Sequence, residues 1–304
     1  MSSTTTVKSQ SIWAYLQLMR PANIITAWAD ILLGFAAAGA VTAEINSLDF
    51  VTLGWLILAT TGLYGGGVVF NDVCDAELDA VERPERPIPT GRASLNGAIA
   101  LGTFLLVMGI VAAAMVSNFS AILAGIVAIT ALLYDKWGKH RTILGPINMG
   151  ACRGGNLLLG VSAIPGAVGD RWYLALIPIV YIAAITAISQ GEVSGGKKIT
   201  GFVAIAFVAI VIGSILGLGI LPEYTLPIAL PFLILFSALV LPPFIKAAIT
   251  PSPELIQMAV KAGVLSLIVL DAAIAAGFTS WLYGLLLLTL LPISRLLARL
   301  FAVT

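Results

Sequence analysis

The sequence predicts an all-α, polytopic membrane helix bundle with nine transmembrane helices and one further apolar segment at the C-terminal end. Of its 304 residues, 59% are hydrophobic and 10% are charged. A soluble domain carries about 25% charged residues, so these few charges could not cover the surface of a water-soluble globule. The apolar residues form runs of about 20, the length that crosses a bilayer as a helix. The connections between the runs alternate in basic content, as expected for loops on opposite sides of a membrane.

Other classes of protein are excluded by the same pattern. A transmembrane β-barrel needs strands of alternating apolar and polar residues, whereas residues 101–116 and 199–221 are apolar on every face. A formal net charge of +1 gives no basic surface for nucleic acid. Cys74 and Cys152 are too few for a disulfide framework.

Ten segments with few charged residues are the predicted helices, and they form a single domain over residues 1–304. Residues 1–11 are expected to be a disordered polar tail. Only Thr279, Ser280 and Trp281 separate the last two segments, so the sequence leaves open whether the tenth is a separate span. In chain order the segments are residues 22–41, 51–71, 95–116, 119–134, 144–165, 172–190, 200–220, 226–247, 259–279 and 281–301.

The basic residues predict the orientation of the bundle. Lys and Arg prefer the cytoplasmic side of a membrane. With the N-terminus inside, fourteen of the sixteen basic residues fall on the inner side. Arg171 falls outside, and Arg153 lies within the fifth segment. We therefore expect the N-terminus and the site on the cytoplasmic side, in the plasma membrane of a bacterium.

Acidic residues gather where the second segment ends. If the helix continues, Asn71, Asp75 and Asp79 lie at i, i+4 and i+8 on one face, with Asp72 beside them. Carboxylates so close repel one another unless a cation neutralises them. Mg²⁺ takes oxygen ligands and shares its sites with substrate phosphates, so this face predicts a magnesium site. The alternative is an acidic helix end that only contacts solvent.

A stiff basic segment follows the acidic face. Its prolines, within residues 84–89, prevent a helix. Arg83, Arg86 and Arg92 are thereby held close to the carboxylates. The guanidinium group binds phosphate oxygens in a bidentate manner, so we expect a diphosphate here.

These motifs resemble those of the UbiA superfamily of intramembrane prenyltransferases. The resemblance rests on Asn-Asp-x-x-Asp-x-x-x-Asp over residues 71–79 and Arg-Pro-x-Arg-Pro-Ile-Pro-x-Gly over residues 83–91. Arg-Pro-x-Asn at residues 20–23 and the Tyr-x4-Lys stretch at residues 134–141 extend it. The run at residues 145–154 resembles a less characterised branch, the EboC-like proteins.

One position departs from the family pattern. The family usually carries a second acidic motif after the sixth span, with two Asp residues four apart. Here Glu192 occupies the first position and Gly196 the second, so one carboxylate is missing. Lys197 offers a positive charge that could replace part of a second ion. The alternatives are a Gly-rich loop without a catalytic role and a branch that has lost activity.

The resemblance implies transfer of a polyprenyl group from its diphosphate to a lipophilic, expected aromatic, acceptor in the bilayer, assisted by Mg²⁺. Asp72, Asp75, Asp79, Glu192 and Lys139 are the expected catalytic residues. The expected Mg²⁺ ligands are Asn71, Asp72, Asp75, Asp79 and Glu192, and the expected substrate-binding residues are Arg20, Asn23, Arg83, Arg86, Tyr134, Asn148, Arg153 and Lys197.

Three ionisable residues lie inside predicted spans. A charged side chain within a membrane is costly and needs a buried partner or a substrate, which marks Arg153, Asp30 and Asp271. Asp30 lies two helical turns beyond Asn23, so both can face one cavity. A structural hydrogen bond is the expected role of Asp271.

A second class of function remains open. Secondary transporters and lipid-binding membrane proteins also carry intramembrane charges, in transporters near the middle of the bilayer. Most charges of this chain lie at one face, which favours an enzyme over a non-catalytic lipid-binding or transport protein with the same fold.

Overall fold

A computed structural model of the chain describes residues 12–41, 47–138, 141, 144–192 and 195–301. Every regular element in these ranges is a helix. A short helix over residues 12–19 comes first. The helices that follow are α2 (Pro21–Ala37), α3 (Ser47–Cys74), α4 (Ala76–Glu82), α5 (Leu95–Ala114), α6 (Asn118–Lys136), α7 (Leu144–Val161), α8 (Ala167–Arg171), the 3-10 helix η2 (Trp172–Ala175), α9 (Leu176–Ser189), α10 (Lys198–Leu218), α11 (Leu226–Ile249), α12 (Pro253–Phe278), α13 (Trp281–Leu288) and α14 (Leu290–Leu300).

The predicted all-α membrane bundle is confirmed. Eight of the described helices are long and apolar enough to cross a membrane, counting α8 to α9 and α13 to α14 as one each. α2 is a shorter apolar helix, and α7 carries the polar residues Asn148, Arg153 and Asn156. All ten predicted apolar segments therefore coincide with helices.

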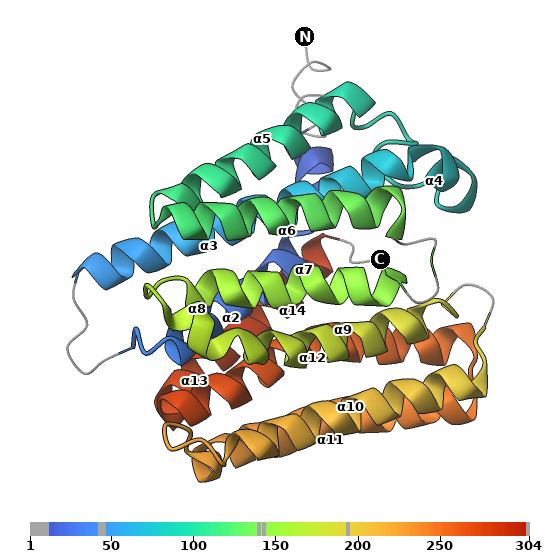
Figure 1. The fold of residues 1–304 in the computed structure, drawn as a ribbon. Coiled ribbons are helices and arrows are strands. Elements are labelled where there is room, and N and C mark those ends of the chain that lie inside the picture. The colour runs from blue at the N-terminus through green and yellow to red at the C-terminus, as the bar shows by residue number, and fades with distance from the viewer. Residues whose placement is uncertain (1–11, 42–46, 139–140, 142–143, 193–194, 302–304) are drawn as a thin grey trace.

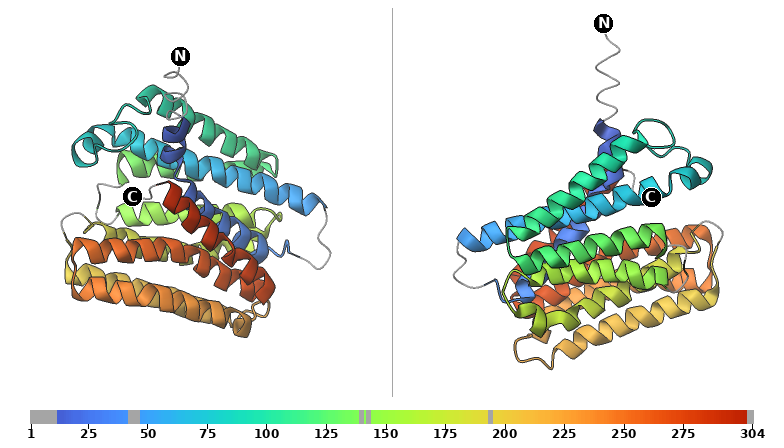
Figure 2. Two further views of the ribbon diagram at one scale, coloured as in Figure 1. Left: turned by 180° about the vertical axis from the view of Figure 1, so that it is seen from behind. Right: turned by 45° about the horizontal axis from the view of Figure 1, so that its top comes forward.

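The long helices lie side by side with alternating direction (Figure 1). α3 packs against α5, α7 against α9, and α11 against α12. The C-terminal α14 runs along α2, as the view from behind shows (Figure 2). The tenth predicted segment is thus part of the bundle, and it is broken at Thr289 between α13 and α14.

Two glycines allow α2 and α7 to approach closely. A Cβ atom added at Gly34 would lie 2.3 Å from the carbonyl oxygen of Leu157, and one at Gly160 would lie 2.6 Å from that of Ile31. Small residues of this kind let membrane helices pack backbone to backbone. The contact matters because α2 and α7 carry the buried polar residues described below.

The predicted continuation of the second span is confirmed, with one break. Helical hydrogen bonds run from the Asp75 N–H to the Asn71 carbonyl and from the Asp79 N–H to the Asp75 carbonyl. Asp75 itself, with φ −93° and ψ 3°, separates α3 from α4. The Pro-rich residues 83–94 then form turns, as predicted, at the α4 end of the bundle (Figure 1).

Candidate active site

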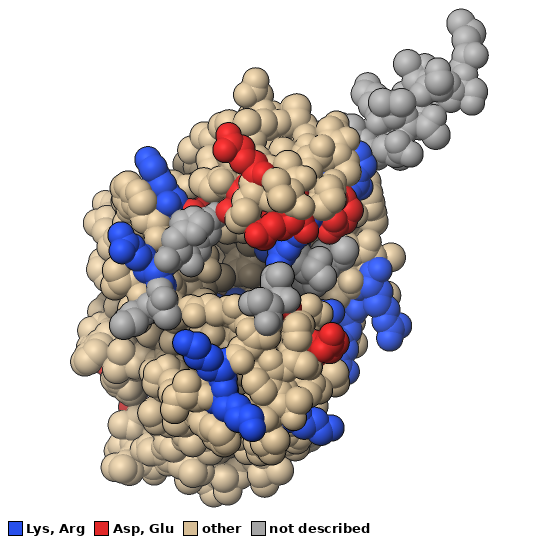
Figure 3. All heavy atoms as spheres, turned by 90° about the vertical axis from the view of Figure 1, so that its right-hand side faces the viewer, with Lys and Arg blue, Asp and Glu red and all other residues tan. Residues whose placement is uncertain are grey.

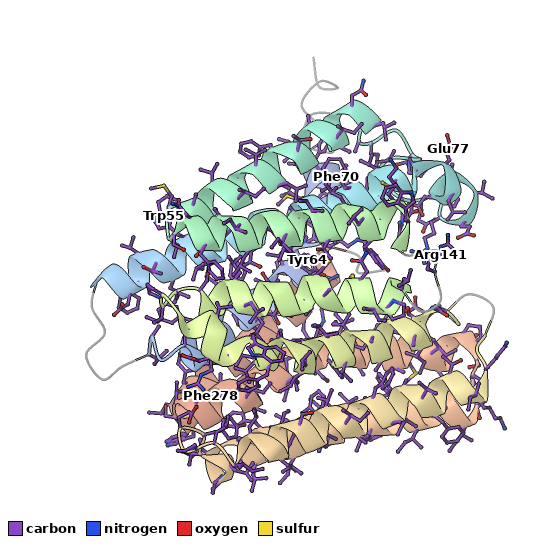
Figure 4. The ribbon with its side chains drawn as sticks, in the orientation of Figure 1. Trp55, Tyr64, Phe70, Glu77, Arg141 and Phe278 are labelled. Carbon is purple, nitrogen blue, oxygen red and sulfur yellow. The ribbon has the colours of Figure 1, made fainter. Side chains whose placement is uncertain are left out.

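A cavity of about 290 Å³ lies within the bundle, between α2, α3, α6, α7, α9 and α12. One helical face of α3 and one of α7 line it at spacings of three and four residues. Figure 4 labels Tyr64, one of the α3 residues, in the middle of the bundle. The lining residues of these two faces are Leu63, Tyr64, Gly67, Val68, Asn71, Met149, Cys152, Arg153 and Asn156.

The cavity combines a polar end with apolar walls. Arg20, Asn23 and Asn71 line it where α2 begins and α3 ends. Apolar side chains such as Ile182 and Leu267 form its walls. Viewed from the α4 side, the molecule is hollowed, with acidic atoms along one rim and basic atoms around and across from them (Figure 3). This arrangement suits a ligand with a charged head and an apolar tail.

Two carboxylates and two arginines form an ion-pair network near the polar end, which we call the carboxylate–arginine network. Asp72 Oδ1 lies 2.6 Å from Arg20 Nη2 and 3.2 Å from Arg86 Nη1. The same Arg86 nitrogen lies 2.7 Å from Asp79 Oδ2. Both carboxylates are buried. Residues from the start of α2, from α3, from α4 and from the Pro-rich connection therefore meet at one point.

The other two members of the acidic motif face α6. Asn71 Nδ2 donates a hydrogen bond of 2.9 Å to Asp135 Oδ1, and Asp75 lies within electrostatic reach of Tyr134. Asp135 is buried and lines the cavity. Sequence reasoning missed Asp135. Its signal was an acidic residue at the end of an apolar run, directly beside the motif residue Tyr134.

The donor chemistry of this region fits Mg²⁺. Asp72 and Asp79 jointly bind one cation, the Arg86 guanidinium, and carboxylate oxygens are the ligands that Mg²⁺ prefers. No group of three or more Asp, Glu, His or Cys side chains is gathered for a metal within the described residues. Asp72 and Asp79, with Asp75 and Asn71 next to them, are the residues that would hold the ion.

Glu192 belongs to a separate group on the same side of the molecule. It is half-buried in the connection between α9 and α10, and Gln257 of α12 donates a hydrogen bond to its carbonyl. Burial raises the pKa of the Glu192 carboxyl, and the positive charges of Arg83 and Lys261 oppose that rise. Arg83 thus links this group to the Pro-rich connection.

A side chain at the position of the missing carboxylate would contact Ile256 of α12. A Cβ atom at Gly196 would meet the Ile256 side chain at 3.1 Å, and one at Gly191 would lie 2.8 Å from the Gly196 backbone. A larger residue at position 196 would therefore require a small shift of the Ile256 side chain. Lys197 is exposed at the start of α10.

The Tyr-x4-Lys stretch is described only in part. Tyr134 lines the cavity. The Asn148 side-chain amide is oriented so that its NH₂ group donates to the Thr130 carbonyl and its oxygen accepts from the Tyr134 N–H. These two hydrogen bonds connect α7 to α6. Lys139, a predicted catalytic residue, lies outside the described residues, as does the predicted tail.

Arg153 has a buried partner, as a charge inside a span requires. Its Nε lies 2.7 Å from Asp30 Oδ2, and its Nη1 donates to Thr26 Oγ1 at 3.1 Å. Asn156 Nδ2 donates to the same Asp30 oxygen at 2.8 Å. Asp30 therefore joins α2 to α7. Asp271 of α12 lies within electrostatic reach of Asp30 and Arg153, and its Oδ2 atom is buried without a hydrogen-bond partner among the described residues. The structural hydrogen bond expected for Asp271 stays a prediction.

Comparison with known proteins covers most of the chain. A digeranylgeranylglyceryl phosphate synthase of Methanoculleus marisnigri is 34% identical over 58% of this chain and 60% of its own length. One of Saccharolobus solfataricus is 29% identical over 59% and 61%. These two matches thus span about three fifths of the relatives' length. A third, of Methanothrix thermoacetophila, is 26% identical over 71% and 81%.

Solved structures share the fold. One, concerned with digeranylgeranylglyceryl phosphate synthase in membranes, has a TM-score of 0.67 at 21% identity, over 88% of this chain and 98% of that chain. A UbiA homologue from Archaeoglobus fulgidus bound to GPP and Mg²⁺ has a TM-score of 0.63 at 15% identity, over 91% and 99%. The model of the UbiA prenyltransferase family matches residues 32–254. The resemblance seen in the motifs is therefore confirmed, and the chain belongs to the UbiA prenyltransferase family.

Proposed function

We propose that this protein transfers a polyprenyl group from its diphosphate to a lipophilic acceptor inside the membrane. The observation that carries the proposal is the position of the carboxylate–arginine network, whose Arg20 lines the polar end of an apolar cavity together with Asn23 and Asn71. An allylic diphosphate has the matching shape, with a charged head and an apolar chain. In the transfer, the bond from prenyl C1 to the diphosphate oxygen breaks and a bond from C1 to the acceptor forms. The acceptor loses one proton, and diphosphate is released.

The residues of the network have distinct tasks in this proposal. Arg20 and Arg86, which here pair with Asp72 and Asp79, bind the diphosphate head when the carboxylates hold Mg²⁺. Bound Mg²⁺ supplies positive charge to the departing diphosphate. The apolar cavity walls exclude water, which protects an allylic cation from hydrolysis.

Glu192 has a supporting task. With one carboxylate where the family usually has two, its group binds a second cation more weakly than a pair of Asp residues would. Arg83, within electrostatic reach of Glu192, and Lys197 add positive charge on the same side of the diphosphate. Glu192→Gln is expected to lower the rate without abolishing it.

For the acceptor we propose a hydroxyl group of a prenylated glyceryl phosphate. The names of the relatives describe a glyceryl phosphate with two geranylgeranyl groups, so the second group must be added to a lipid that already carries one. An aromatic acceptor, expected from the resemblance alone, has no such support from these relatives. The geranylgeranyl chain is the proposed donor chain on the same ground.

We further propose that the cavity opens to the cytoplasm, because the carboxylate–arginine network lies on the side predicted to carry fourteen of the sixteen basic residues. The bacterial plasma membrane stays a prediction from the sequence. The relatives described above come from archaea.

A reconstituted assay tests the proposal. Purified protein in lipid nanodiscs receives geranylgeranyl diphosphate, Mg²⁺ and either geranylgeranylglyceryl phosphate or a hydroxybenzoate. We expect diphosphate release and a product of the mass of digeranylgeranylglyceryl phosphate with the first acceptor. Asp72→Asn should abolish product, whereas Asp49→Asn at the opposite end of α3 should not.

The outcomes separate the two classes of function. Product made equally well by Asp72→Asn, or in the presence of a chelator, would contradict the assignment of the network. Tight binding of the diphosphate without any release of diphosphate, with either acceptor, would instead favour the lipid-binding or transport alternative. Product with the hydroxybenzoate alone would overturn the proposed acceptor and keep the enzyme.

A further inference from the structure

A second polar cluster lines the cavity away from the carboxylate–arginine network. It consists of Arg153 and Asn156 of α7, Thr26 and Asp30 of α2, and Asp271 of α12. Arg153 is 6% exposed and Asp30 is fully buried. Arg153, Thr26 and Asn156 line the cavity. The cluster is therefore deep in the bundle, yet part of it faces the space that a substrate would fill.

Arg153 has hydrogen-bond donors to spare. Its guanidinium carries five N–H groups. One N–H on each of its three nitrogens is used, by Asp30, by Thr26 Oγ1 and by the Thr26 carbonyl. The two remaining N–H groups, one on each Nη atom, have no partner among the described residues. A buried N–H group without a hydrogen-bond partner is unfavourable, so a ligand that supplies an oxygen here gains affinity.

The charges of the cluster indicate which kind of oxygen. Asp30 Oδ2 lies 2.7 Å from Arg153 Nε, so the guanidinium already has a buried carboxylate as its counter-charge. Asp271 lies within electrostatic reach of both groups and adds no positive charge. With no unpaired positive charge to offset the desolvation of an anion, the cluster favours a neutral oxygen over a phosphate.

The position of the cluster assigns it to a different part of the ligand from the diphosphate. Along α2, Thr26 lies six residues from Arg20, about 9 Å at 1.5 Å per residue. Tyr64 lies within electrostatic reach of both Arg20 and Arg153, and it hydrogen-bonds Asn23. Apolar side chains such as Val264 and Leu267 complete the walls. A prenyl chain alone offers no acceptor for the Arg153 donors.

We propose that Arg153 is a positioning residue for the acceptor, and that its two spare N–H groups bind a neutral oxygen of that substrate, as a hydroxyl, ether or carbonyl group. Asp30 and Thr26 hold the guanidinium in place. This inference rests on the proposed function to the extent that the ligand is taken to be the acceptor. The binding of the oxygen can be measured without catalysis.

The test is equilibrium binding in lipid nanodiscs. One probe is a monogeranylgeranyl glycerol ether, whose head has only neutral oxygens, and the other is a hydrocarbon of the same chain without oxygen. We expect the wild type to bind the ether at least tenfold more tightly than the hydrocarbon. Arg153→Lys, which keeps a charge opposite Asp30 but loses the planar set of donors, should remove that tenfold preference.

Three controls make the result specific. Geranylgeranyl diphosphate should bind Arg153→Lys as it binds the wild type, because its head lies at Arg20. Arg171→Lys should change none of the affinities, because Arg171 pairs with Glu223 and neither residue lines the cavity. If Arg153→Lys does not fold, the double variant Asp30→Asn/Arg153→Met removes both charges together and should lose the same preference.

The possible outcomes are distinct. An unchanged preference for the ether in both variants, or an equal loss of affinity for the ether, the hydrocarbon and the diphosphate, would overturn the inference. Failure of the wild type to bind geranylgeranyl diphosphate would overturn the proposed function. The comparison of ether with hydrocarbon would still decide whether Arg153 binds a neutral oxygen.

Discussion

Asp79 lies two helical turns from Asp72, yet the two side chains meet at one guanidinium. Arg86 Nη1 contacts both carboxylates, at 2.7 Å and 3.2 Å. Neither distance follows from helix spacing alone, because the break at Asp75 separates α3 from α4. The two buried carboxylates thus share one cation, which in this structure is the Arg86 guanidinium. In the proposed reaction the same two carboxylates would hold Mg²⁺.

Asp79→Asn should lower prenyl transfer by roughly 100-fold or more, because it removes a charge that the proposed Mg²⁺ site requires. Its control is Glu77→Gln on the same short helix, where the side chain is exposed (Figure 4). That variant should stay within twofold of the wild type. Initial rates of diphosphate release at saturating Mg²⁺ provide the measurement. Equal rates for the two variants would contradict a special role of Asp79.

Glu192 predicts a dependence of stability on pH. Burial raises the pKa of its carboxyl in the folded protein, whereas an unfolded Glu has a pKa of about 4.3. Folding therefore favours the protonated form of Glu192, which adds to the free energy of unfolding. This stabilisation is complete at a pH below the unfolded pKa, and it is lost as the pH rises through the raised pKa of the folded state. Glu192→Gln should remove this part of the pH dependence. Thermal unfolding in detergent without divalent cations, from about pH 4 to pH 8, measures it.

The opposite sign would contradict this account of Glu192. If the wild type gained stability relative to Glu192→Gln as the pH rose over that range, Arg83 and Lys261 would outweigh the burial of the carboxyl. Lys197→Gln serves as a control, because Lys197 is exposed and is not among the groups that act on Glu192.

At the scale of elements, the close contact of α2 with α7 positions the Arg153 cluster. Gly34 and Gly160 bring the two backbones together, and the bonds from Arg153 and Asn156 to Asp30 cross the same interface. Truncating one partner of such a buried pair leaves a charge uncompensated, which costs about 3–5 kcal/mol. Helix packing and the polar cluster therefore depend on each other.

Gly160→Ala should destabilise the protein by about 1–3 kcal/mol, because the added methyl group would lie 2.6 Å from the Ile31 carbonyl oxygen. The matched control is Gly125→Ala in α6, where a Cβ atom meets nothing within 4 Å. There the better helix propensity of alanine should leave stability equal or raise it by up to about 1 kcal/mol. The measurement is the midpoint of thermal unfolding of the two variants in the same detergent. A midpoint for Gly160→Ala at or above that of Gly125→Ala would contradict the close contact.

At the scale of the whole molecule, the charges predict a single orientation in the membrane. The exposed Cys74 lies at the end of α3, on the side of the carboxylate–arginine network. Glu223 lies between α10 and α11, at the opposite end of the bundle, and pairs with Arg171. A membrane-impermeant maleimide should therefore label Cys74 in inverted vesicles, where the cytoplasmic side faces the reagent, and should leave it unlabelled in right-side-out vesicles.

A paired variant completes that test. In a Cys74→Ser/Cys152→Ser background, Glu223→Cys should be labelled only from the outer side. Labelling of both positions from the same side would contradict the arrangement of the helices between them. Reversal of both together would contradict the orientation and leave the fold intact.

The fold class and the identity of most candidate residues follow from the amino-acid sequence. Apolar runs of membrane length predict helices directly, because the bilayer core demands satisfied backbone hydrogen bonds within each segment. The acidic and Pro-rich motifs at residues 71–79 and 83–91 are specific enough to indicate the family on their own. The family match then supports that interpretation. Their roles in metal and diphosphate binding stay predictions.

Which of these groups meet depends on the tertiary structure. Pairing of Arg86 with both Asp72 and Asp79, and of Asp135 with Asn71, requires the turn of the Pro-rich connection and the packing of α6 beside α3. The cluster of Arg153, Asp30 and Asp271 joins residues more than 100 positions apart. Sequence spacing orients side chains only within one helix. The contacts between helices depend on backbone approach and packing, which here bring a buried arginine to the wall of the cavity.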